Sequence, residues 1–487
     1  MKSLSNLISN WSSIRIVGDT QKEVRGICQD SRKIKSGEIF VARKGDVFDG
    51  HHFINEVIHR GVEVILCEYL PHDLHPSVCY LISDKMDSDI LHLLKEYYDN
   101  PSEQLILIGV TGTNGKTTTA TLLFHNFRAL GFKCGLISTI RIIIHDHELE
   151  STHTTPDLIS LYALLNDMVE AGCSHVFMEV SSHALVQDRI AGLKFVLAIF
   201  TNITQDHLDF HGTMTEYIKG KKKFFDQLEK SSFALINSDD RNSSVMVQNT
   251  VAKVYTYAIH SPADFQCKIL ESDLNGMELR YKNISLYTSL IGEFNAYNLM
   301  AVLGSSILLG IEEQEAMQAI SSLKPVEGRF EWIKGHSKKL TAVIDYAHTD
   351  DAVEKILQSI RSICMPQQRI ITVIGCGGNR DRDKRPKMAQ AAVLNSDQVI
   401  LTSDNPRNEE PGDIINEMEN GLTADQKKKT LSIVDRHQAI KTACIIANTN
   451  DIILIAGKGH EKYQEIKGKK IPFDDKKEIE ELFIQDI

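Results

Sequence analysis

Residues 105–118 read LILIGVTGTNGKTT, an apolar run that leads directly into a glycine-rich loop ending in Lys-Thr-Thr. Apolar side chains then recur at helical spacing, at Ala120, Leu123, Phe127 and Leu130, and Gly131 ends the pattern. A strand, a glycine loop and a helix in this order predict a phosphate cradle, because glycines let backbone N–H groups close around phosphate oxygens. Lys116 is suited to reach the outer phosphates and Thr117 to ligate Mg²⁺. We therefore expect a nucleotide-binding site here, although the common pattern has a glycine where Val110 stands.

Apolar runs elsewhere in the chain predict further strands. Two of them, His175–Val180 and Val196–Ile203, alternate with helical patterns, which favours a parallel sheet. Four more occur in the last third, each followed by polar and glycine-rich residues: Leu340–Ile344, Arg369–Ile374, Gln398–Thr402 and Asp451–Ala456. The first hundred residues hold shorter runs separated by turns, such as Ile39–Ala42 and Val62–Leu66.

These blocks predict an α/β protein with three domains. At about 100–200 residues per domain, a chain of 487 residues has room for several cores. We expect a small N-terminal α/β domain over 1–100, a central domain with a P-loop-like, mostly parallel sheet over 101–327, and a C-terminal Rossmann-like α/β domain over 328–487. Ligands of open α/β sheets bind beyond the carboxyl ends of the strands, so the loops that follow these strands should carry the chemistry.

The composition is that of a soluble globular protein with 42% hydrophobic and 24% charged residues. The net charge of -11 gives no global positive field for nucleic acid. The N-terminal stretch lacks the apolar core and cleavage site of a signal peptide, and no apolar run approaches the roughly 18–20 residues of a membrane span. Nine cysteines occur singly without a CxxC pair, which predicts reduced thiols in a cytoplasm.

Three polar segments are ambiguous when each is taken alone. Glu179 lies at the end of a predicted strand and is suited to Mg²⁺, but a surface glutamate fits equally well. The run 201–212 is dense in His and Asp, which is typical of a metal or phosphate loop and also of a capped turn. The lysine cluster in 217–225 would by itself indicate a solvated basic face.

Together these segments resemble the Mur ligase family of ATP-dependent amide-forming enzymes, and the resemblance covers essentially the whole chain. The matching motifs are Asp30-Ser31-Arg32, Asp49-Gly50-His51, residues 111–118, Thr154-Thr155-Pro156-Asp157, Glu179–Leu185, Gly292–Asn298, Asp345-Tyr346-Ala347-His348, Gly375–Arg380, Asp404-Asn405-Pro406-Arg407 and Gly457–Glu461. One departure is Thr349-Asp350-Asp351, where the family has Thr-Pro-Asp; the loss of proline predicts a less rigid loop.

The resemblance implies two Mg²⁺ ions beside ATP. Thr117 and Glu179 would ligate one ion, and His207 with a carbamylated Lys221 the other. A carbamate would supply an anionic oxygen where an ammonium would repel the metal, and the neighbouring Lys219, Lys222 and Lys223 would favour the neutral amine that attacks CO₂. The implied catalytic residues are Lys116, Lys221, His207 and Glu179. The implied ATP-binding residues are Gly112, Thr113, Asn114, Gly115, Lys116, Thr117, Thr118, Asn298, Arg329 and Asp345.

The resemblance also implies sites for a sugar nucleotide and an amino acid. The residues expected to bind the UDP-muramoyl-dipeptide are Ser31, Thr154, Thr155, Ser181, Gln187 and Arg189. Those expected to bind the incoming amino acid are Arg380, Asp404, Asn405, Pro406, Arg407, Gly457 and Glu461. Arg407 would pair with a substrate carboxylate and Glu461 with the distal ammonium, which favours meso-diaminopimelate over L-lysine.

The implied reaction belongs to peptidoglycan precursor synthesis. By this resemblance, ATP would phosphorylate the γ-carboxylate of UDP-N-acetylmuramoyl-L-alanyl-D-glutamate, and the amine of meso-diaminopimelate would attack the acyl phosphate. A lysine-adding or folate-polyglutamate-type ligase is the close alternative. A switch GTPase would need an Asp-ended second strand and a guanine-reading loop, which the sequence does not offer, and a plain nucleotide-binding regulator would need no amino-acid site. We expect a monomer without nucleic-acid or membrane partners.

Overall fold

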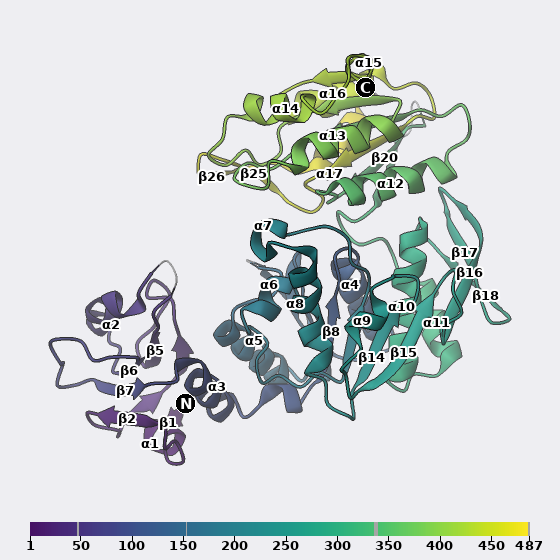
Figure 1. Cartoon of the computed structure of the whole chain (residues 1–487). Coiled ribbons are helices and arrows are strands. Elements are labelled where there is room, and N and C mark those ends of the chain that lie inside the picture. Colours follow the sequence, from purple (N-terminus) through teal and green to yellow (C-terminus); the bar gives the residue numbers. More distant parts are fainter. Residues whose placement is uncertain (46–47, 152, 336–338, 486–487) are drawn as a thin grey trace. The chain divides into compact units, whose positions relative to one another are not determined.

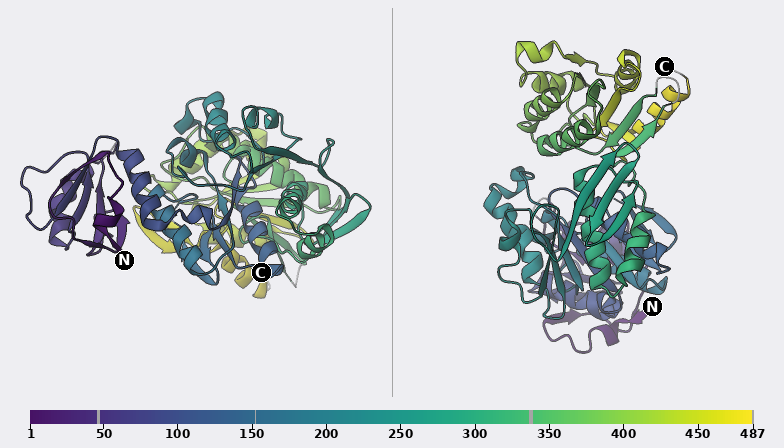
Figure 2. Two further views of the ribbon diagram at one scale, coloured as in Figure 1. Left: turned by 90° about the horizontal axis from the view of Figure 1, so that it is seen from below. Right: turned by 90° about the vertical axis from the view of Figure 1, so that its right-hand side faces the viewer.

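The computed structural model describes residues 1–45, 48–151, 153–335 and 339–485 (Figures 1 and 2). The chain divides into two compact units. The first comprises Met1–Ile108 with Phe132–Val196, and the second comprises Gly109–Gly131 with Leu197–Ile487. Among the described residues no helix has both the length and the apolar character needed to span a membrane.

The first unit begins with a five-stranded sheet, whose strands in spatial order are β2 (Ile14–Val17), β7 (Cys79–Ser83), β6 (Val64–Cys67), β5 (Glu38–Ala42) and β4 (Gly26–Cys28). All pairs are parallel except β2 with β7. Side chains alternate between the two faces, because successive strand residues point in opposite directions. One face packs on α1 (Leu4–Leu7) and α3 (Met86–Tyr98), and the other on α2 (Ile54–His59).

β1 (Lys2–Ser3) and β3 (Glu23–Val24) form a separate antiparallel pair in this unit. Residues 132–196 contribute further strands in the order β11 (His147–Glu150), β10 (Arg141–Ile144), β9 (Cys134–Ile137) and β12 (His175–Glu179). β9 and β12 are parallel, whereas β10 forms antiparallel pairs on both sides. Two helices accompany them, α5 (Leu158–Glu170) and α6 (Ser182–Val186). The strand predicted at 175–180 is therefore confirmed as β12.

The strand that precedes the glycine-rich loop is β8 (Ile106–Thr111), and the boundary between the two units falls within it. The glycine-rich loop and α4 (Lys116–Ala129) belong to the second unit. The second unit continues with parallel strands β13 (Leu197–Phe200), β14 (Phe233–Asn237), β15 (Lys253–Ala258) and β16 (Phe265–Asp273). An antiparallel extension follows, with β17 (Gly276–Tyr281) and β18 (Ile284–Thr288). Its helices are α7 (Leu208–His211), α8 (Met214–Asp226), α9 (Ser243–Met246), α10 (Glu293–Leu308) and α11 (Glu313–Ser321).

The last part of the second unit is a six-stranded sheet in the order β19 (Glu331–Lys334), β20 (Thr341–Asp345), β24 (Ile452–Ala456), β21 (Ile370–Ile374), β22 (Gln398–Leu401) and β23 (Thr430–Ser432). Only the β19–β20 pair is antiparallel. Helices cover both faces (Figure 1): α12 (Asp350–Ile363), α13 (Lys384–Asn395) and α14 (Pro411–Glu419) on one, α16 (Arg436–Ile446) and α17 (Asp475–Ile484) on the other. A hairpin of β25 (Tyr463–Ile466) and β26 (Lys469–Pro472) precedes α17.

These elements confirm the predicted α/β class, the mostly parallel central strands and the Rossmann-like C-terminal sheet. The predicted strand at 196–203 is wrong in length, because β13 ends at Phe200. The next backbone N–H, that of Thr201, donates to Thr111 O at 3.0 Å, and the chain then follows the glycine loop. The division at residues 100 and 327 stays a prediction.

Candidate active site

The glycine-rich loop is held in shape by the segment that follows β13. Gly112 has a φ of 146°, and a Cβ there would lie 1.9 Å from Thr201 Oγ1, so only glycine fits. The backbone N–H of Asn114 donates to Asn202 Oδ1 at 3.0 Å, and Thr201 Oγ1 donates to Asn114 O at 2.7 Å. The loop is therefore preorganised by its neighbour.

Lys116 and Thr117 lie at the N-terminus of α4, as the sequence predicts. The Lys116 ammonium donates to Gly112 O at 3.1 Å and to Thr113 O at 2.8 Å, so it lies over its own loop. The buried Thr117 hydroxyl accepts a hydrogen bond from Arg329 Nη2 at 3.1 Å. A cation and a hydroxyl at a helix N-terminus are suited to phosphate.

Two of the predicted nucleotide residues contact this helix. Asn298 on α10 is buried, and its Oδ1 accepts a hydrogen bond from Thr119 Oγ1 at 3.1 Å. Arg329, which contacts Thr117, also places its guanidinium over the ring of Tyr346, 4.5 Å from the centroid. The structure thus brings Asn298 and Arg329 to the glycine loop.

Asp345 ends β20 and shapes the turn that follows it. Its carboxylate accepts the backbone N–H groups of Phe330 at 2.6 Å and of Ala347 at 2.7 Å. Burial raises the pKa of Asp345 to about 6, although Arg329 and these two N–H groups act in the opposite direction.

The loop after β20 compensates for its missing proline. Thr349 caps α12 by accepting the N–H of Ala352 at 3.2 Å, so the helix begins at Asp350 without proline. Asp351 Oδ2 accepts hydrogen bonds from Asn114 Nδ2 and from Thr204 Oγ1, both at 3.0 Å. The expected looseness is therefore countered by contacts with the glycine loop.

Lys221 on α8 is the buried lysine of the cluster. Its side chain is 1% exposed, its Nζ donates to Gly112 O at 2.7 Å, and the ammonium lies 4.7 Å from the centre of the Tyr217 ring. Burial, and then the charge of Lys116, lower its pKa well below the ordinary value. A neutral amine is thereby favoured, as carbamylation requires.

The cause of that shift differs from the one expected from the sequence. Lys219 pairs with Glu216 at 2.7 Å, and Lys222 pairs with Asp226 at 2.6 Å. Lys223 is exposed. The cluster is therefore mostly the solvated face of an amphipathic helix, and burial together with Lys116 depresses the pKa of Lys221.

Asp206, which the sequence analysis did not single out, lies beside the predicted ligand His207. Asp206 is 6% exposed and pairs with Lys384 at 2.6 Å and with His207 Nε2 at 3.3 Å. Burial opposes its charge, but His207, His348 and Lys384 outweigh burial and lower the pKa of Asp206. The His- and Asp-rich loop thus places a buried carboxylate next to the basic side chains of His207 and Lys384.

In the first unit, Glu179 lies at the carboxyl end of β12 and is fully buried. Its Oε1 accepts the N–H of Thr139 at 2.7 Å, and its Oε2 lies 3.2 Å from Thr139 Oγ1. The same hydroxyl donates to Thr154 Oγ1 at 3.0 Å. Thr139 was missed because no motif marks it.

The other predicted sugar-nucleotide residues of this region gather around Thr155. Thr155 Oγ1 donates to Glu179 O at 2.8 Å and accepts the N–H of Ser181 at 3.1 Å. Arg189 donates to Thr155 O at 2.8 Å and holds Gln187 Oε1 with two hydrogen bonds of 2.9 and 2.6 Å. Five predicted residues and Glu179 therefore form one polar cluster.

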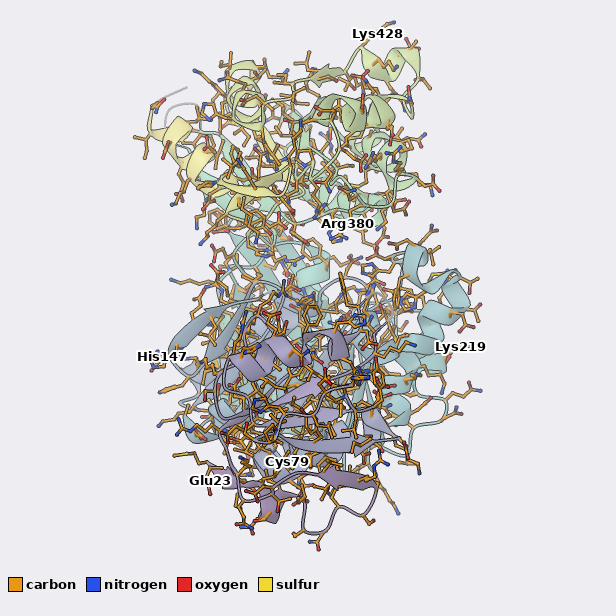
Figure 3. The ribbon with its side chains drawn as sticks, turned by 90° about the vertical axis from the view of Figure 1, so that its left-hand side faces the viewer. Glu23, Cys79, His147, Lys219, Arg380 and Lys428 are labelled. Atoms are coloured by element: carbon orange, nitrogen blue, oxygen red, sulfur yellow. The ribbon has the colours of Figure 1, made fainter. Side chains whose placement is uncertain are left out.

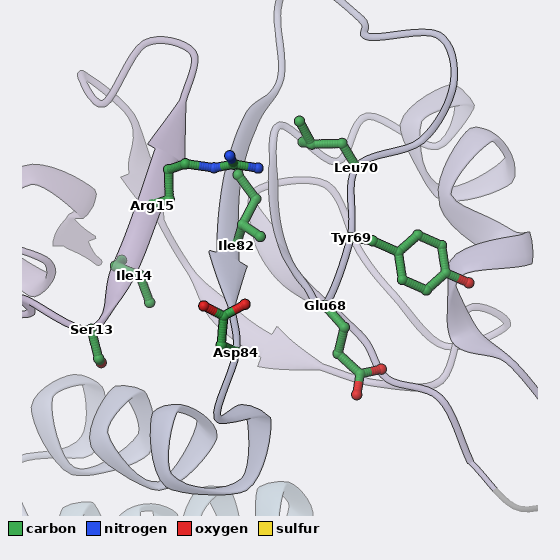
Figure 4. Close-up of a pocket in the computed structure, with 8 residues that line it drawn as sticks. All are labelled: Ser13, Ile14, Arg15, Glu68, Tyr69, Leu70, Ile82 and Asp84. Atoms are coloured by element: carbon green, nitrogen blue, oxygen red, sulfur yellow. The ribbon is translucent and has the colours of Figure 1, made fainter.

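Ser31 is buried in the loop after β4, where its carbonyl accepts a hydrogen bond from Arg60 at 2.9 Å. The ends of the neighbouring strands β6 and β7 border a cavity of about 410 Å³. Figure 4 shows Arg15 on β2 opposite the residues that follow β6. The lining residues are Ser13, Ile14, Arg15, Glu68, Tyr69, Leu70, Ile82 and Asp84. Ser31 and this cavity share the carboxyl edge of the parallel strands.

A buried charged cluster joins the loops after β22 and β24. Asn405 Nδ2 donates to Glu461 Oε2 at 2.7 Å, and Lys458 Nζ lies 3.1 Å from the same oxygen and 3.6 Å from Asp404 Oδ1. Burial and Asp404 raise the pKa of Glu461, against the effect of Lys458. Gly457 admits Asp404, since a Cβ there would lie 3.0 Å from Asp404 Oδ2. Lys458 lies between two glycines in the motif 457–461, and the sequence alone indicates no role for it.

Arg407 lies beside this cluster in the left-handed backbone region, with a φ of 52°. Its Nη1 donates to Gly378 O at 2.7 Å, and its Nε lies 3.4 Å from Glu465. A Cβ at Gly378 would lie 1.9 Å from Pro406 O, so the two loops touch. Arg380 follows in the glycine loop with an exposed side chain (Figure 3).

Within the described ranges, no group of three or more His, Cys, Asp or Glu side chains is arranged to hold a metal ion. The predicted metal residues fall in both units, with Glu179 in the first and Thr117, His207 and Lys221 in the second.

The chain thus combines an α/β fold, a strand–glycine loop–helix unit and a buried acidic cluster beside Arg407, an arrangement suited to a nucleotide-dependent ligase. Three family descriptions match it: the Mur ligase family catalytic domain over residues 23–92, the Mur ligase middle domain over 110–306, and the Mur ligase glutamate ligase domain over 328–459. A curated relative matches at 52% identity over almost its full length. The chain belongs to the Mur ligase family.

That relative is the UDP-N-acetylmuramoyl-L-alanyl-D-glutamate--2,6-diaminopimelate ligase of Cytophaga hutchinsonii, and the match covers 98% of each chain. A solved structure of an enzyme with the same name is 29% identical, with a TM-score of 0.68 over 100% of this chain and 99% of that one. The MurF ligase of Thermotoga maritima in complex with ADP shares the fold at 19% identity and a TM-score of 0.66, over 89% and 94% of the two chains.

Proposed function

We propose that the chain is an ATP-dependent ligase that adds meso-2,6-diaminopimelate to UDP-N-acetylmuramoyl-L-alanyl-D-glutamate in peptidoglycan precursor synthesis. The observation that carries the proposal is the 52% identity, over 98% of both chains, to a ligase of that name. The three domains over 1–100, 101–327 and 328–487 would bind the UDP substrate, ATP and the amino acid, respectively.

The phosphate loop supports the first chemical step, transfer of the γ-phosphoryl group of ATP to the D-glutamyl γ-carboxylate. Such transfer needs positioning and charge neutralisation more than covalent participation of the protein. Lys116 would exchange the carbonyls of Gly112 and Thr113 for phosphate oxygens, and the N-terminus of α4 would add N–H donors. Asn298, Arg329 and Asp345 would hold the rest of the nucleotide.

Two Mg²⁺ ions would neutralise the charge of the phosphates during this step. The residues fit such ions by their chemistry, since Thr117 offers a hydroxyl, Glu179 a fully buried carboxylate and His207 an imidazole. We assign Thr117 and Glu179 to one ion, and His207 with carbamylated Lys221 to the other. The buried, pKa-depressed amine of Lys221 supports its carbamylation.

The polar cluster around Thr155 supports binding of the muramoyl-dipeptide. Arg189 is held by Gln187 and by the carbonyl of Thr155, so its guanidinium is oriented for carboxylate or diphosphate oxygens. Thr154 and Ser181 supply hydroxyls in the same cluster. Ser31 would contact the uridine end from the loop after β4.

The second step is attack of the diaminopimelate amine on the acyl phosphate, which forms the amide and releases phosphate. Arg407 would bind the distal carboxylate through two parallel hydrogen bonds, and Glu461 would bind the distal ammonium. Asp404, Asn405, Pro406, Gly457 and Arg380 would complete the pocket. L-lysine lacks the distal carboxylate, so it would leave Arg407 desolvated and without its partner.

The test measures kcat/KM of the purified full chain with ATP, Mg²⁺, UDP-muramoyl-dipeptide and either amino acid. Phosphate release gives the rate, and the mass of the product identifies the amino acid that was added. We expect meso-diaminopimelate to be preferred by about 10⁴-fold or more. Equal or better use of L-lysine would refute the substrate assignment, and glutamate addition to a folate would indicate the other alternative. Arg407→Lys keeps the positive charge but loses the planar guanidinium with its two parallel donors, so it should reduce the preference for meso-diaminopimelate over L-lysine. The cytoplasmic location and monomeric state stay predictions.

A further inference from the structure

Arg385, on the first turn of α13, is an almost fully buried guanidinium. Its side chain is 1% exposed, and its Nη1 and Nη2 donate to the two carboxylate oxygens of Glu409 at 3.0 and 2.9 Å. Nη1 also donates to Glu417 at 2.7 Å. Burying a guanidinium with two carboxylates is costly, and apolar side chains of similar volume often serve stability as well. Its position between two loops suggests a different use.

The first loop that Arg385 holds is the glycine loop after β21. Arg385 Nη2 donates to Gly377 O at 3.3 Å. Glu409, held by Arg385, accepts the backbone N–H of Asn379, a residue with a φ of 52°. Hydrogen bonds from Arg385 lower the pKa of Glu409 to about 2, so this carboxylate stays charged. The loop is therefore fixed on both sides of Gly378.

The second loop is 404–407, which carries the proposed carboxylate-binding arginine. Arg407 Nη1 donates to Gly378 O, and a Cβ at Gly377 would lie 2.9 Å from that same nitrogen. The N–H of Gly378 donates to Asn405 O at 2.9 Å. The position of the Arg407 guanidinium thus depends on the glycine loop that Arg385 holds.

We propose that Arg385 is a positioning residue of the amino-acid pocket: through Glu409 and Gly377 it fixes the glycine loop, and this loop aims Arg407. The proposal rests on the proposed function in taking residues 404–407 as the amino-acid site. Arg385 itself contacts no substrate; it acts by restricting where the guanidinium of Arg407 can point.

The chain provides a matched control. Arg382 contacts the same two carboxylates, Glu409 at 3.1 Å and Glu417 at 3.3 Å, but its side chain is 65% exposed. Exposed ion pairs contribute little because water screens them. Arg382→Met therefore removes an equal charge from the same partners, but it leaves in place the hydrogen bonds of Glu409 and Arg385 to the backbone of Asn379 and Gly377.

The experiment measures the KM for each of the three substrates in wild type, Arg385→Lys and Arg382→Met. A lysine keeps the charge but cannot form the two parallel hydrogen bonds. We expect Arg385→Lys to raise the KM for the amino acid by about 10-fold or more. The KM values for ATP and the UDP substrate should change by less than about two-fold, and Arg382→Met should change none of the three beyond that range.

Thermal unfolding of each variant shows whether it is folded. If Arg385→Lys does not unfold cooperatively, Glu409→Gln, which keeps the shape of the side chain, replaces it with the same expectation. An unchanged KM for the amino acid in a folded variant overturns the proposal, and so does an equal rise in all three KM values. Should the wild type prefer another amino acid, the substrate assignment fails, and Arg385 is tested with the amino acid that the wild type uses.

Discussion

The buried lysine of α8 gives the sharpest prediction about catalysis. Lys221→Ala removes the amine of a residue that is 1% exposed, and this amine donates a hydrogen bond to Gly112 O in the glycine-rich loop. Loss of one preorganised polar group at a reacting centre costs about 10²–10³-fold in rate. Because a carbamate on Lys221 would also hold a metal ion, we expect the upper end of that range.

The same substitution should leave a folded protein. Three methylenes leave the core, at about 0.8 kcal/mol each, so packing loses about 2 kcal/mol. The loss is partly offset, because the strongly depressed pKa of Lys221 indicates that burial of the charged amine is unfavourable. Lys221→Met keeps most of the packing and should be equally inactive, which separates catalysis from stability.

The assay is ADP formation in the presence of all three substrates, with and without small carboxylic acids. These acids should partly rescue Lys221→Ala, because the shortened side chain leaves space for a carboxylate, and should not rescue Lys221→Met, which fills that space. Lys219→Ala is the control, because Lys219 is exposed on the same helix and pairs with Glu216 (Figure 3). Full activity of Lys221→Ala would refute the reasoning, as would an experimental structure with both metals beside an unmodified lysine.

Three further outcomes can be measured. Lys116→Ala should lose about 10²–10³-fold in turnover with an unchanged melting curve, because it removes charge at the phosphates and no core packing; near-normal rates would show that the loop does not hold ATP. Burial lowers the pKa of His175 from 6.5 to about 4, so between these two values the unfolded chain binds more protons than the folded one. The contribution of His175 to the free energy of unfolding therefore falls by about 3 kcal/mol from pH 7 to pH 4. His175→Gln should remove this fall in the pH profile of urea unfolding, and His72→Gln, at an exposed site, is the matched control. Arg436→Met leaves the fully buried carboxyl group of Asp475 without its ion-pair partner, so urea unfolding should show a loss of about 3–5 kcal/mol, and the double variant with Asp475→Leu should recover most of it.

Several buried parallel strands could be predicted because their apolar runs are short, continuous and bounded by turn residues, whereas strands such as β14–β18 were not predicted. β12, β21, β22 and β24 lie within one residue of the predicted runs, as expected for parallel strands buried on both faces. β13 is shorter than its run, because Thr201 and the residues after it leave the sheet to support the glycine loop. Apolar character alone does not show where a strand gives way to such a loop.

The side chains that position the site could not be predicted in the same way. Thr139, Asp206 and Arg385 each contact residues that are distant in sequence. No local pattern marks Thr139 or Arg385, and the His- and Asp-dense run around Asp206 does not show that its partner is Lys384. Lys221 shows the same limit in another form. Its depressed pKa was predicted from lysines nearby in the sequence, whereas the structure attributes it to burial and to Lys116, which is 105 positions away (221 − 116).

The glycine-rich loop after β8 and the loop 404–407 are positioned in the same way. In each, a glycine after one strand lets the backbone approach the loop after another strand: Gly112 approaches Thr201, and Gly378 approaches Pro406. A Cβ on either glycine would lie only 1.9 Å from an oxygen atom of its neighbour. The approach positions a cation, Lys116 in the first case and Arg407 in the second. A side chain at either glycine would therefore displace the partner loop and the cation together. The glycines are visible in the sequence, but their function depends on which strand ends lie side by side, and this follows only from the order of the strands in the sheet.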